Sequence, residues 1–277
     1  MKTLGVALGG GGARGLAHLP VLAFLDEHHL RPDRMAGTSI GSIVGALYAS
    51  GKSAADIQAD WHRYVVREED RKRDVLKKIP DLVKWLGSVQ FDFHGTGMVR
   101  SEKFLELLIG DLGEQTFEDL EIPLQVVATD FWSGEEVVID SGPLLPAIMA
   151  SMAIPGVFPP VEREGRVLVD GGMANNVPYD LLLDRCDFTL AVDVAPARTP
   201  GKKNVPHAMD VTLGMFDMLI EKVMNQKLAQ RQPDLYLKPG IRDVRVLEFD
   251  KVDTIYRQAG EMVEELEKQL RELKLIS

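Results

Sequence analysis

The chain has 277 residues, of which 45% are hydrophobic and 27% charged, a composition typical of a folded protein with an ample core. Its formal net charge of −10 disfavours a nucleic-acid partner and lasting attachment to anionic lipid, although brief contact with a membrane stays compatible with it. The single cysteine, Cys186, excludes an internal disulfide framework and a cysteine-rich metal site, and it fits a reducing compartment.

The first apolar run, Thr3 to Leu8, ends in glycine and predicts a buried strand. It is shorter than the hydrophobic stretch of a secretory signal, which has roughly 7–15 residues. No stretch of the sequence approaches the ~18–20 apolar residues that a membrane-spanning helix requires. We therefore expect a cytoplasmic protein.

Four glycines, Gly9 to Gly12, follow this strand and precede a helix that is predicted by leucines at positions 16, 19, 22 and 25. Glycine lets the backbone approach another group closely, so a dinucleotide pyrophosphate, a developing oxyanion or tight packing would each explain the loop. A dinucleotide site would need a carboxylate about 20 residues later, at the end of the second strand. That place holds Ala36-Gly37-Thr38-Ser39, which argues against the cofactor.

The second predicted strand ends in Gly37-Thr38-Ser39-Ile40-Gly41, a G-x-S-x-G sequence between a strand and a helix. In such a turn the serine occupies a sharp bend, and the flanking glycines let strand and helix approach each other. The helix that follows would place the Ser39 hydroxyl at its N-terminus, where its dipole favours developing negative charge. The pattern predicts a nucleophile at Ser39, with an oxyanion hole donated by the backbone amides of Gly10, Gly11 and Gly12.

A third helix is predicted from Ser53, because its pairing with Asp56 is typical of a helix start. Residues 67–97 then mix basic and apolar residues within an acidic chain. The favoured interpretation is a solvated amphipathic insertion that covers part of the core. The alternative is a lid that touches a lipid surface through Val83, Trp85 and Leu86.

The second half of the sequence alternates predicted strands with predicted helices. Strands are expected at 122–130, 135–140, 166–170, 187–194 and near 235–239, and helices at 144–153, 178–186, 211–230 and 253–275. Pro178 would occupy the first position of its helix. This alternation predicts an α/β fold with a mostly parallel sheet covered on both faces, in a single domain over residues 1–277.

A serine nucleophile needs a base, and the sequence offers two candidates. His207 follows the strand-end acid Asp193, in the Ser-Asp-His order of an α/β-hydrolase, but it lies in a polar loop. Asp170 ends an apolar strand directly before Gly171-Gly172, which places its carboxylate at the edge where parallel sheets bind ligands. An ordinary Asp-Gly turn would have the same sequence.

Four blocks of this sequence resemble the patatin-like phospholipase family. They are Gly10 to Gly15, Gly37 to Gly41, Ala150 to Val161 and Asp170 to Gly172. The resemblance covers about residues 3–195, in the family's order and spacing, and leaves a C-terminal helical part of about residues 205–277 without a motif. Pro20 departs from the bacterial relatives, which usually carry glycine there, and this puts no catalytic residue in doubt.

The resemblance implies a three-layer α/β/α sandwich and a serine–aspartate dyad that uses no histidine, metal or cofactor. Ser39 would be the nucleophile and Asp170 the general base, supported by Arg14, Gly15, Gly37, Gly41, Gly171 and Gly172. It also implies an acyl-enzyme and a lipid or acyl-ester substrate, in the manner of phospholipase A, lysophospholipase or carboxylesterase. The alternative is a regulatory or scaffold protein of the same fold that binds a lipid or protein ligand with little turnover. The sequence predicts no oligomeric state.

Overall fold

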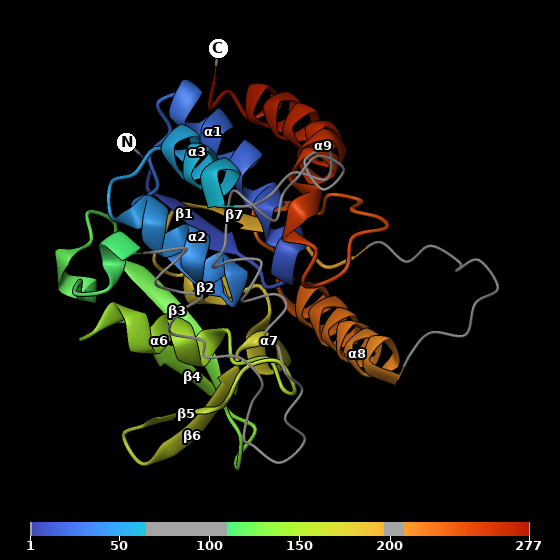
Figure 1. Ribbon diagram of the computed structural model, residues 1–277. Coiled ribbons are helices and arrows are strands. Elements are labelled where there is room, and N and C mark those ends of the chain that lie inside the picture. The colour runs from blue at the N-terminus through green and yellow to red at the C-terminus, as the bar shows by residue number, and fades with distance from the viewer. Residues whose placement is uncertain (1, 65–109, 197–207, 277) are drawn as a thin grey trace.

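The computed structural model describes residues 2–64, 110–196 and 208–276, and an eight-stranded sheet runs through its centre (Figure 1). The strand order is β5-β6-β3-β2-β1-β7-β8, with β4 paired to β3. The strands are β1 (Leu4–Leu8), β2 (Arg34–Thr38), β3 (Leu124–Asp130), β4 (Glu136–Ile139), β5 (Val161–Arg163), β6 (Arg166–Asp170), β7 (Phe188–Val192) and β8 (Leu235–Leu237). The segment 67–97 and His207 lie outside the described residues.

The sheet is parallel in its centre and antiparallel at one edge. Neighbours among β3, β2, β1, β7 and β8 are parallel, as the sequence predicts, whereas β4 and β6 run antiparallel to β3, and β5 to β6. The connection between β5 and β6 explains the antiparallel pairing of these two strands, because only Glu164 and Gly165 separate them and both have positive φ, of 53° and 76°. A two-residue turn of this kind joins antiparallel strands, while parallel neighbours need a longer crossover.

Helices follow most of the predicted segments. They are α1 (His18–Glu27), α2 (Ile40–Ala49), α3 (Ala54–Tyr64), α6 (Leu144–Ser151), α7 (Gly172–Asn175), α8 (Ala208–Gln230) and α9 (Val252–Glu272), with 3-10 turns η1 (Gly12–Ala17), η4 (Gly110–Leu112), η5 (Phe117–Asp119), η6 (Tyr179–Leu181) and η7 (Phe249–Lys251). The helix expected over 178–186 is wrong, since only the turn η6 forms there. Buried Tyr179 and Leu182 are three residues apart, a spacing that one 3-10 turn satisfies.

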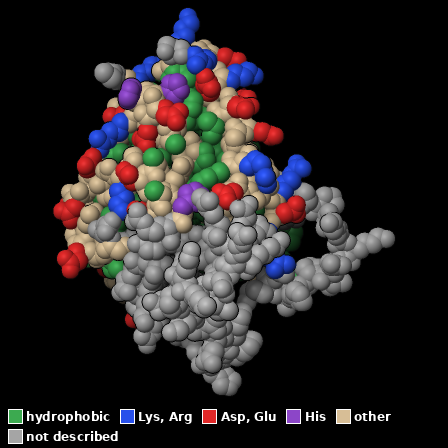
Figure 2. All heavy atoms as spheres, turned by 45° about the horizontal axis from the view of Figure 1, so that its top comes forward, with side chains coloured by type: hydrophobic (Ala, Val, Ile, Leu, Met, Phe, Trp, Pro, Cys, Tyr) green, Lys and Arg blue, Asp and Glu red, His purple; other side chains and the backbone are tan. Residues whose placement is uncertain are grey.

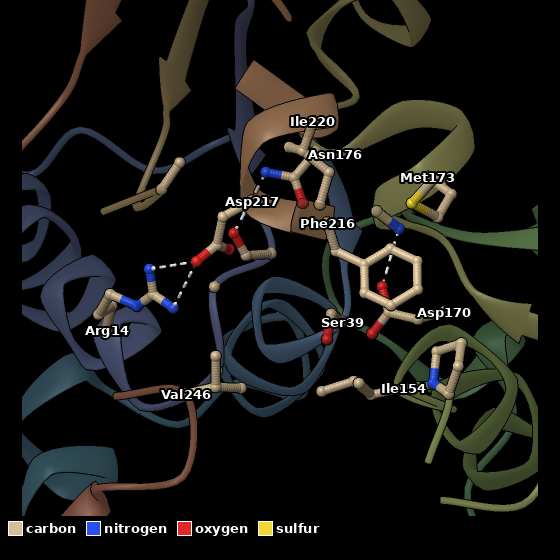
Figure 3. A pocket seen from close by; sticks show the side chains of 16 residues that line it. Arg14, Ser39, Ile154, Asp170, Met173, Asn176, Phe216, Asp217, Ile220 and Val246 are labelled. Atoms are coloured by element: carbon tan, nitrogen blue, oxygen red, sulfur yellow. Dashed lines mark hydrogen bonds and ion pairs between the residues drawn. The ribbon is translucent and has the colours of Figure 1, made fainter. Parts of the chain in front are cut away.

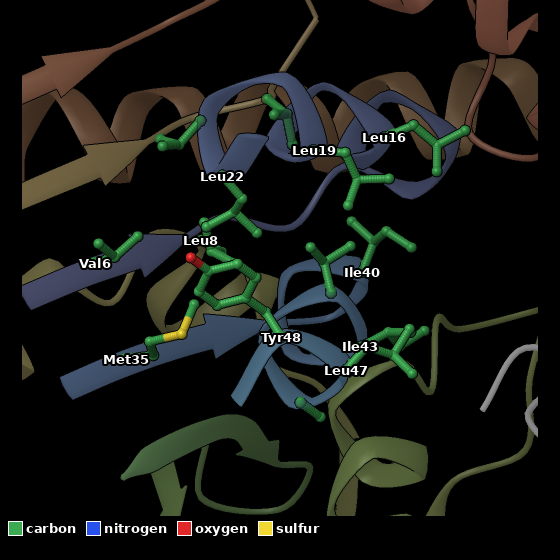
Figure 4. Packing of buried hydrophobic residues seen from close by; sticks show 14 of the residues in the cluster. Val6, Leu8, Leu16, Leu19, Leu22, Met35, Ile40, Ile43, Leu47 and Tyr48 are labelled. Atoms are coloured by element: carbon green, nitrogen blue, oxygen red, sulfur yellow. The ribbon is translucent and has the colours of Figure 1, made fainter. Parts of the chain in front are cut away.

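Helices cover both faces of the sheet because successive strand residues point to opposite sides. Val6 and Leu8 of β1 pack against α1 and α2 in the larger hydrophobic cluster (Figure 4), which also contains residues of α9. Ala7 belongs to a second cluster, with η6 residues and Met224 of α8. The same alternation in β2 and β7 gives the three-layer α/β/α arrangement.

The C-terminal part of the chain joins this framework. α9 buries residues at intervals of three or four on the side that meets the larger cluster: Val252, Ile255, Ala259, Met262, Leu266 and Leu270. Within the described residues, no helix is long and apolar enough to cross a membrane. Acidic and basic side chains are interspersed on the described face in Figure 2.

Gly41→Ala should destabilise the fold, because a Cβ there would lie 2.1 Å from the Leu8 carbonyl oxygen. We expect the free energy of unfolding to fall by about 1–3 kcal/mol or more, measured by urea denaturation. Gly45→Ala, in the same helix, is the matched control. Its Cβ would meet only the ends of flexible side chains, the nearest being Leu124 Cδ1 at 3.3 Å, so stability should change little. Equal losses in the two variants would contradict this account of the packing.

Candidate active site

The register of the strands brings the ends of β2 and β6 together. Thr38 pairs with Val127, and Asp170 pairs with Ala128, the next residue of β3. Ser39 directly follows Thr38, so it lies beside Asp170 in one pocket (Figure 3). Gly171 permits this approach, since a Cβ there would lie 2.2 Å from the Val127 carbonyl oxygen.

Ser39 occupies a strained turn between β2 and α2. Its φ of 53° and ψ of −124° belong to a region that residues with side chains rarely adopt. The Ser39 amide donates to Ser151 Oγ at 2.8 Å, and that hydroxyl donates to the Val127 carbonyl at 2.6 Å. The Ser39 carbonyl accepts from the Ser42 amide and hydroxyl, at 2.9 and 2.6 Å. Sequence reasoning did not single out Ser151, although it belongs to the third block.

The Asp170 carboxylate has a raised pKa. Removal of water around it raises its pKa to about 6, against the lowering effects of the Gly172 amide and the Ser39 side chain. The Gly172 amide donates to Asp170 Oδ1 at 2.8 Å and so orients the carboxylate. The group is a stronger base than an ordinary aspartate and is still ionised at neutral pH.

The glycine-rich loop offers two available amides where the sequence predicted three. The Gly10 amide donates to the Asn176 carbonyl at 3.0 Å, and Asn176 Nδ2 donates back to the Gly10 carbonyl at 3.2 Å. This pairing removes Gly10 from the expected set of oxyanion donors. The amides of Gly11 and Gly12 bond to no acceptor in the part of the chain that the structure describes. Gly12 has a φ of 59°, a conformation that favours glycine.

Arg14 and His18 support the loop from inside the protein. Arg14 is 2% exposed and pairs with Asp217 of α8 at 3.5 Å. Burial lowers the pKa of its guanidinium, and Asp217 opposes that effect. His18 is fully buried, with its pKa lowered to about 4 mainly by desolvation, so the ring is neutral. Its Nε2 lies 2.8 Å from the Gly9 carbonyl and donates to it, because a carbonyl only accepts.

Asp193, the acid in the alternative triad with His207, is bound to other groups. Its buried carboxylate accepts from the Tyr236 hydroxyl and the Ala195 amide, the latter at 2.9 Å, and lies 3.3 Å from Lys238 Nζ. Asp193 does not line the pocket that holds Ser39. Among the described residues, no three His, Cys, Asp or Glu side chains gather in a way that could hold a metal ion.

The pocket has the polar side chains of Ser39 and Asp170 on one side and apolar side chains around them. It contains about 620 Å³ of empty space, part of it open to solvent. Its polar side chains include Ser39, Asp170 and Asn176. Its apolar walls are Ile154, Pro155, Met173, Ala195, Phe216, Ile220 and Val246. This arrangement suits an apolar chain whose polar end faces a hydroxyl and a carboxylate.

Much of this sequence is similar to that of known proteins. Residues 6–183 match the family model of patatin-like phospholipase. An uncharacterized NTE family protein of Mycobacterium bovis is 35% identical over 199 residues, which are 70% of this chain and 51% of that protein. Lysophospholipase NTE1 of Debaryomyces hansenii is 29% identical over 280 residues, 92% of this chain and 17% of that protein. The chain thus spans about half, or much less, of these relatives' length.

Solved structures give a weaker likeness. VipD from Legionella pneumophila has a TM-score of 0.47 at 18% identity, covering 95% of this chain and 67% of that one. Human GIVD cytosolic phospholipase A2 has a TM-score of 0.46 at 11% identity, with 95% and 57% covered. A likeness with TM-scores below 0.5 is too weak to support a conclusion about this chain. The family model, however, matches more than half of the chain, and the chain therefore belongs to the patatin-like phospholipase family.

Proposed function

We propose that this protein is a lipid acyl hydrolase of the phospholipase A, lysophospholipase or carboxylesterase type. The observation that carries the proposal is the juxtaposition of Ser39 and Asp170 in a largely apolar pocket. Family membership and the name of the lysophospholipase relative support a lipid ester as the substrate. The supporting glycines Gly15, Gly37, Gly41, Gly171 and Gly172 act by permitting close packing around the two side chains.

In the proposed reaction, Ser39 Oγ attacks the ester carbonyl while Asp170 accepts the hydroxyl proton. The negative charge that forms on the carbonyl oxygen is stabilised by the amides of Gly11 and Gly12 and by the N-terminus of α2. Collapse expels the alcohol, which takes the proton from Asp170, and leaves an acyl-enzyme. Water, deprotonated by Asp170, then attacks the acyl carbon, and Ser39 recovers its proton as the fatty acid leaves.

The alternative is a regulatory or scaffold protein that binds a lipid or protein ligand without turnover. The backbone at Ser39 argues against it, because such a conformation costs about 1–3 kcal/mol and binding alone does not require it. A fluorophosphonate probe separates the two functions. Labelling of Ser39 supports the hydrolase, while an unlabelled Ser39 in folded protein supports the scaffold.

The proposal also includes brief contact of the protein with a lipid surface. The exposed apolar side chains Met215, Met218 and Leu219 lie on α8, the helix that also lines the pocket, and they support brief contact with a lipid surface.

We further propose a cytoplasmic location and a single domain over residues 1–277. The single domain is supported by β8, which joins the central sheet, and by α9, which joins the larger hydrophobic cluster.

Ser39→Ala should lower turnover of short-chain p-nitrophenyl esters by about 10⁴-fold or more, because the attacking oxygen is removed. It should also abolish fluorophosphonate labelling without lowering the melting temperature. Ser50→Ala, at the other end of α2, is the matched control and should keep wild-type rates. Turnover that survives in Ser39→Ala would refute the assignment of the nucleophile.

The pH dependence of kcat/KM should follow Asp170. Only the ionised carboxylate accepts a proton, so the rate should be lost as pH falls through about 6, the pKa of this group. Asp170→Asn should lower the rate by about 10⁴-fold, as when one member of a nucleophile–base unit is removed. If Asp170→Asn kept a near-wild-type rate, the base would have to be another group, and the dyad would be wrong.

Ser151→Ala should lower both stability and activity, since it removes the acceptor of the Ser39 amide and the donor to the Val127 carbonyl. We expect the free energy of unfolding to fall by about 1–3 kcal/mol, together with slower labelling of Ser39 by a fluorophosphonate. Ser133→Ala, in the exposed turn between β3 and β4, is the control. A Ser151→Ala protein labelled at the wild-type rate would show that this hydroxyl does not position the nucleophile.

A further inference from the structure

We infer that Phe216 and Ile220 of α8 set the length of the acyl chain that the pocket accepts. This inference rests on the proposed function, since it concerns the substrate of the same site. Both residues lie beyond residue 183, where the match to the family model ends. The part of the pocket that they form is therefore contributed by a segment that the family match does not describe.

The two side chains form one wall of the pocket. They are four residues apart, so they lie on the same face of α8, and both line the cavity. In Figure 3, α8 crosses above the site, and the Phe216 ring projects from it toward Ser39 and Asp170. Ile220 reaches the start of α7, close to Asp170, because its Cδ1 is 3.4 Å from where a Cβ on Gly172 would lie. An acyl chain attached to Ser39 Oγ would therefore meet this wall.

Contacts within the wall and beyond its C-terminal end hold α8 in place. Between Phe216 and Ile220, Asp217 pairs with buried Arg14 at 3.5 Å. Two turns further on, Lys227 Nζ donates to Asn175 Oδ1 at 2.6 Å and to the Val177 carbonyl at 2.8 Å. Because the backbone of α8 is anchored at these points, the wall would not move aside for a longer chain. A fixed wall selects substrates by length, whereas a mobile one would accept any length.

The other residues that line the pocket are less suited than Phe216 and Ile220 to select substrates by acyl-chain length. Ile154, Pro155 and Met173 come from segments next to the proposed catalytic residues, and Val246 packs on the glycine-rich loop, where its carbonyl accepts from the Ala13 amide at 2.7 Å. A substitution at any of these residues would also disturb the positions of Ser39, Asp170 or the glycine-rich loop. Phe216 bears no polar group and makes no hydrogen bond through its side chain, so truncating it enlarges the pocket without removing a polar contact.

The test is a series of p-nitrophenyl esters from acetate to palmitate, at one detergent concentration, with kcat/KM measured for each. Phe216→Ala and Ile220→Ala should shift the preferred ester to longer chains, and Ile220→Phe should shift it to shorter ones. One methylene in a hydrophobic pocket changes kcat/KM by about 10- to 200-fold, so we expect at least a tenfold change in the ratio of long to short esters. Phe216→Leu provides a milder truncation if the alanine variant does not fold.

Phe131→Ala is the matched control, because it removes an equal side chain that is 56% exposed and does not line the pocket. Its ester profile should equal that of the wild type. The inference is overturned if the α8 variants hydrolyse esters with the wild-type profile, or if they lose rate equally on all chain lengths. That result differs from failure of the proposed function, in which the wild type would hydrolyse no ester and Ser39 would not be labelled.

Discussion

The site depends on one peptide unit of β3, the link between Val127 and Ala128. Val127 pairs with the last residue of β2, and Ala128 pairs with the last residue of β6, so the chain segments that carry Ser39 and Asp170 are set side by side. The Val127 carbonyl also accepts the Ser151 hydroxyl, which in turn binds the Ser39 amide. Backbone pairing in a twisted sheet is rigid, and this gives the two side chains a fixed separation without a direct covalent or metal link.

The glycines around the site act mainly through the absence of a side chain. A Cβ on Gly15 would lie 2.2 Å from an Ile40 methyl group, and one on Gly12 would lie 2.3 Å from the Val246 carbonyl oxygen. The layers therefore approach more closely than any larger residue would allow. The glycine-rich loop lines the same pocket as Ser39, and the amides of Gly11 and Gly12 have no backbone partner among the described residues.

The C-terminal part of the chain completes a site whose sequence motifs all lie before it. Asp217 of α8 neutralises Arg14 inside the protein, and Phe216 and Ile220 line the pocket next to Ser39. The family match ends at residue 183, yet Phe216, Asp217 and Ile220, which lie beyond it, line the same pocket as Ser39. The proposed catalytic pair and the wall that faces it therefore come from different parts of the chain, one inside and one outside the family match.

The strand–turn–helix at Ser39, the strand end at Asp170, the α/β fold and the two long C-terminal helices could be predicted from the residue pattern, because each rests on local periodicity and on glycines at turns. Which amides are available and which charges are buried depends instead on contacts between segments that are distant in the chain. Gly10 and Asn176 are 166 residues apart, and Arg14 and Asp217 are 203 apart. The helix expected over 178–186 failed for the same reason, since Tyr179 and Leu182 are fixed by packing against the sheet and α8. Local patterns carry no information about partners that meet only when the sheet forms.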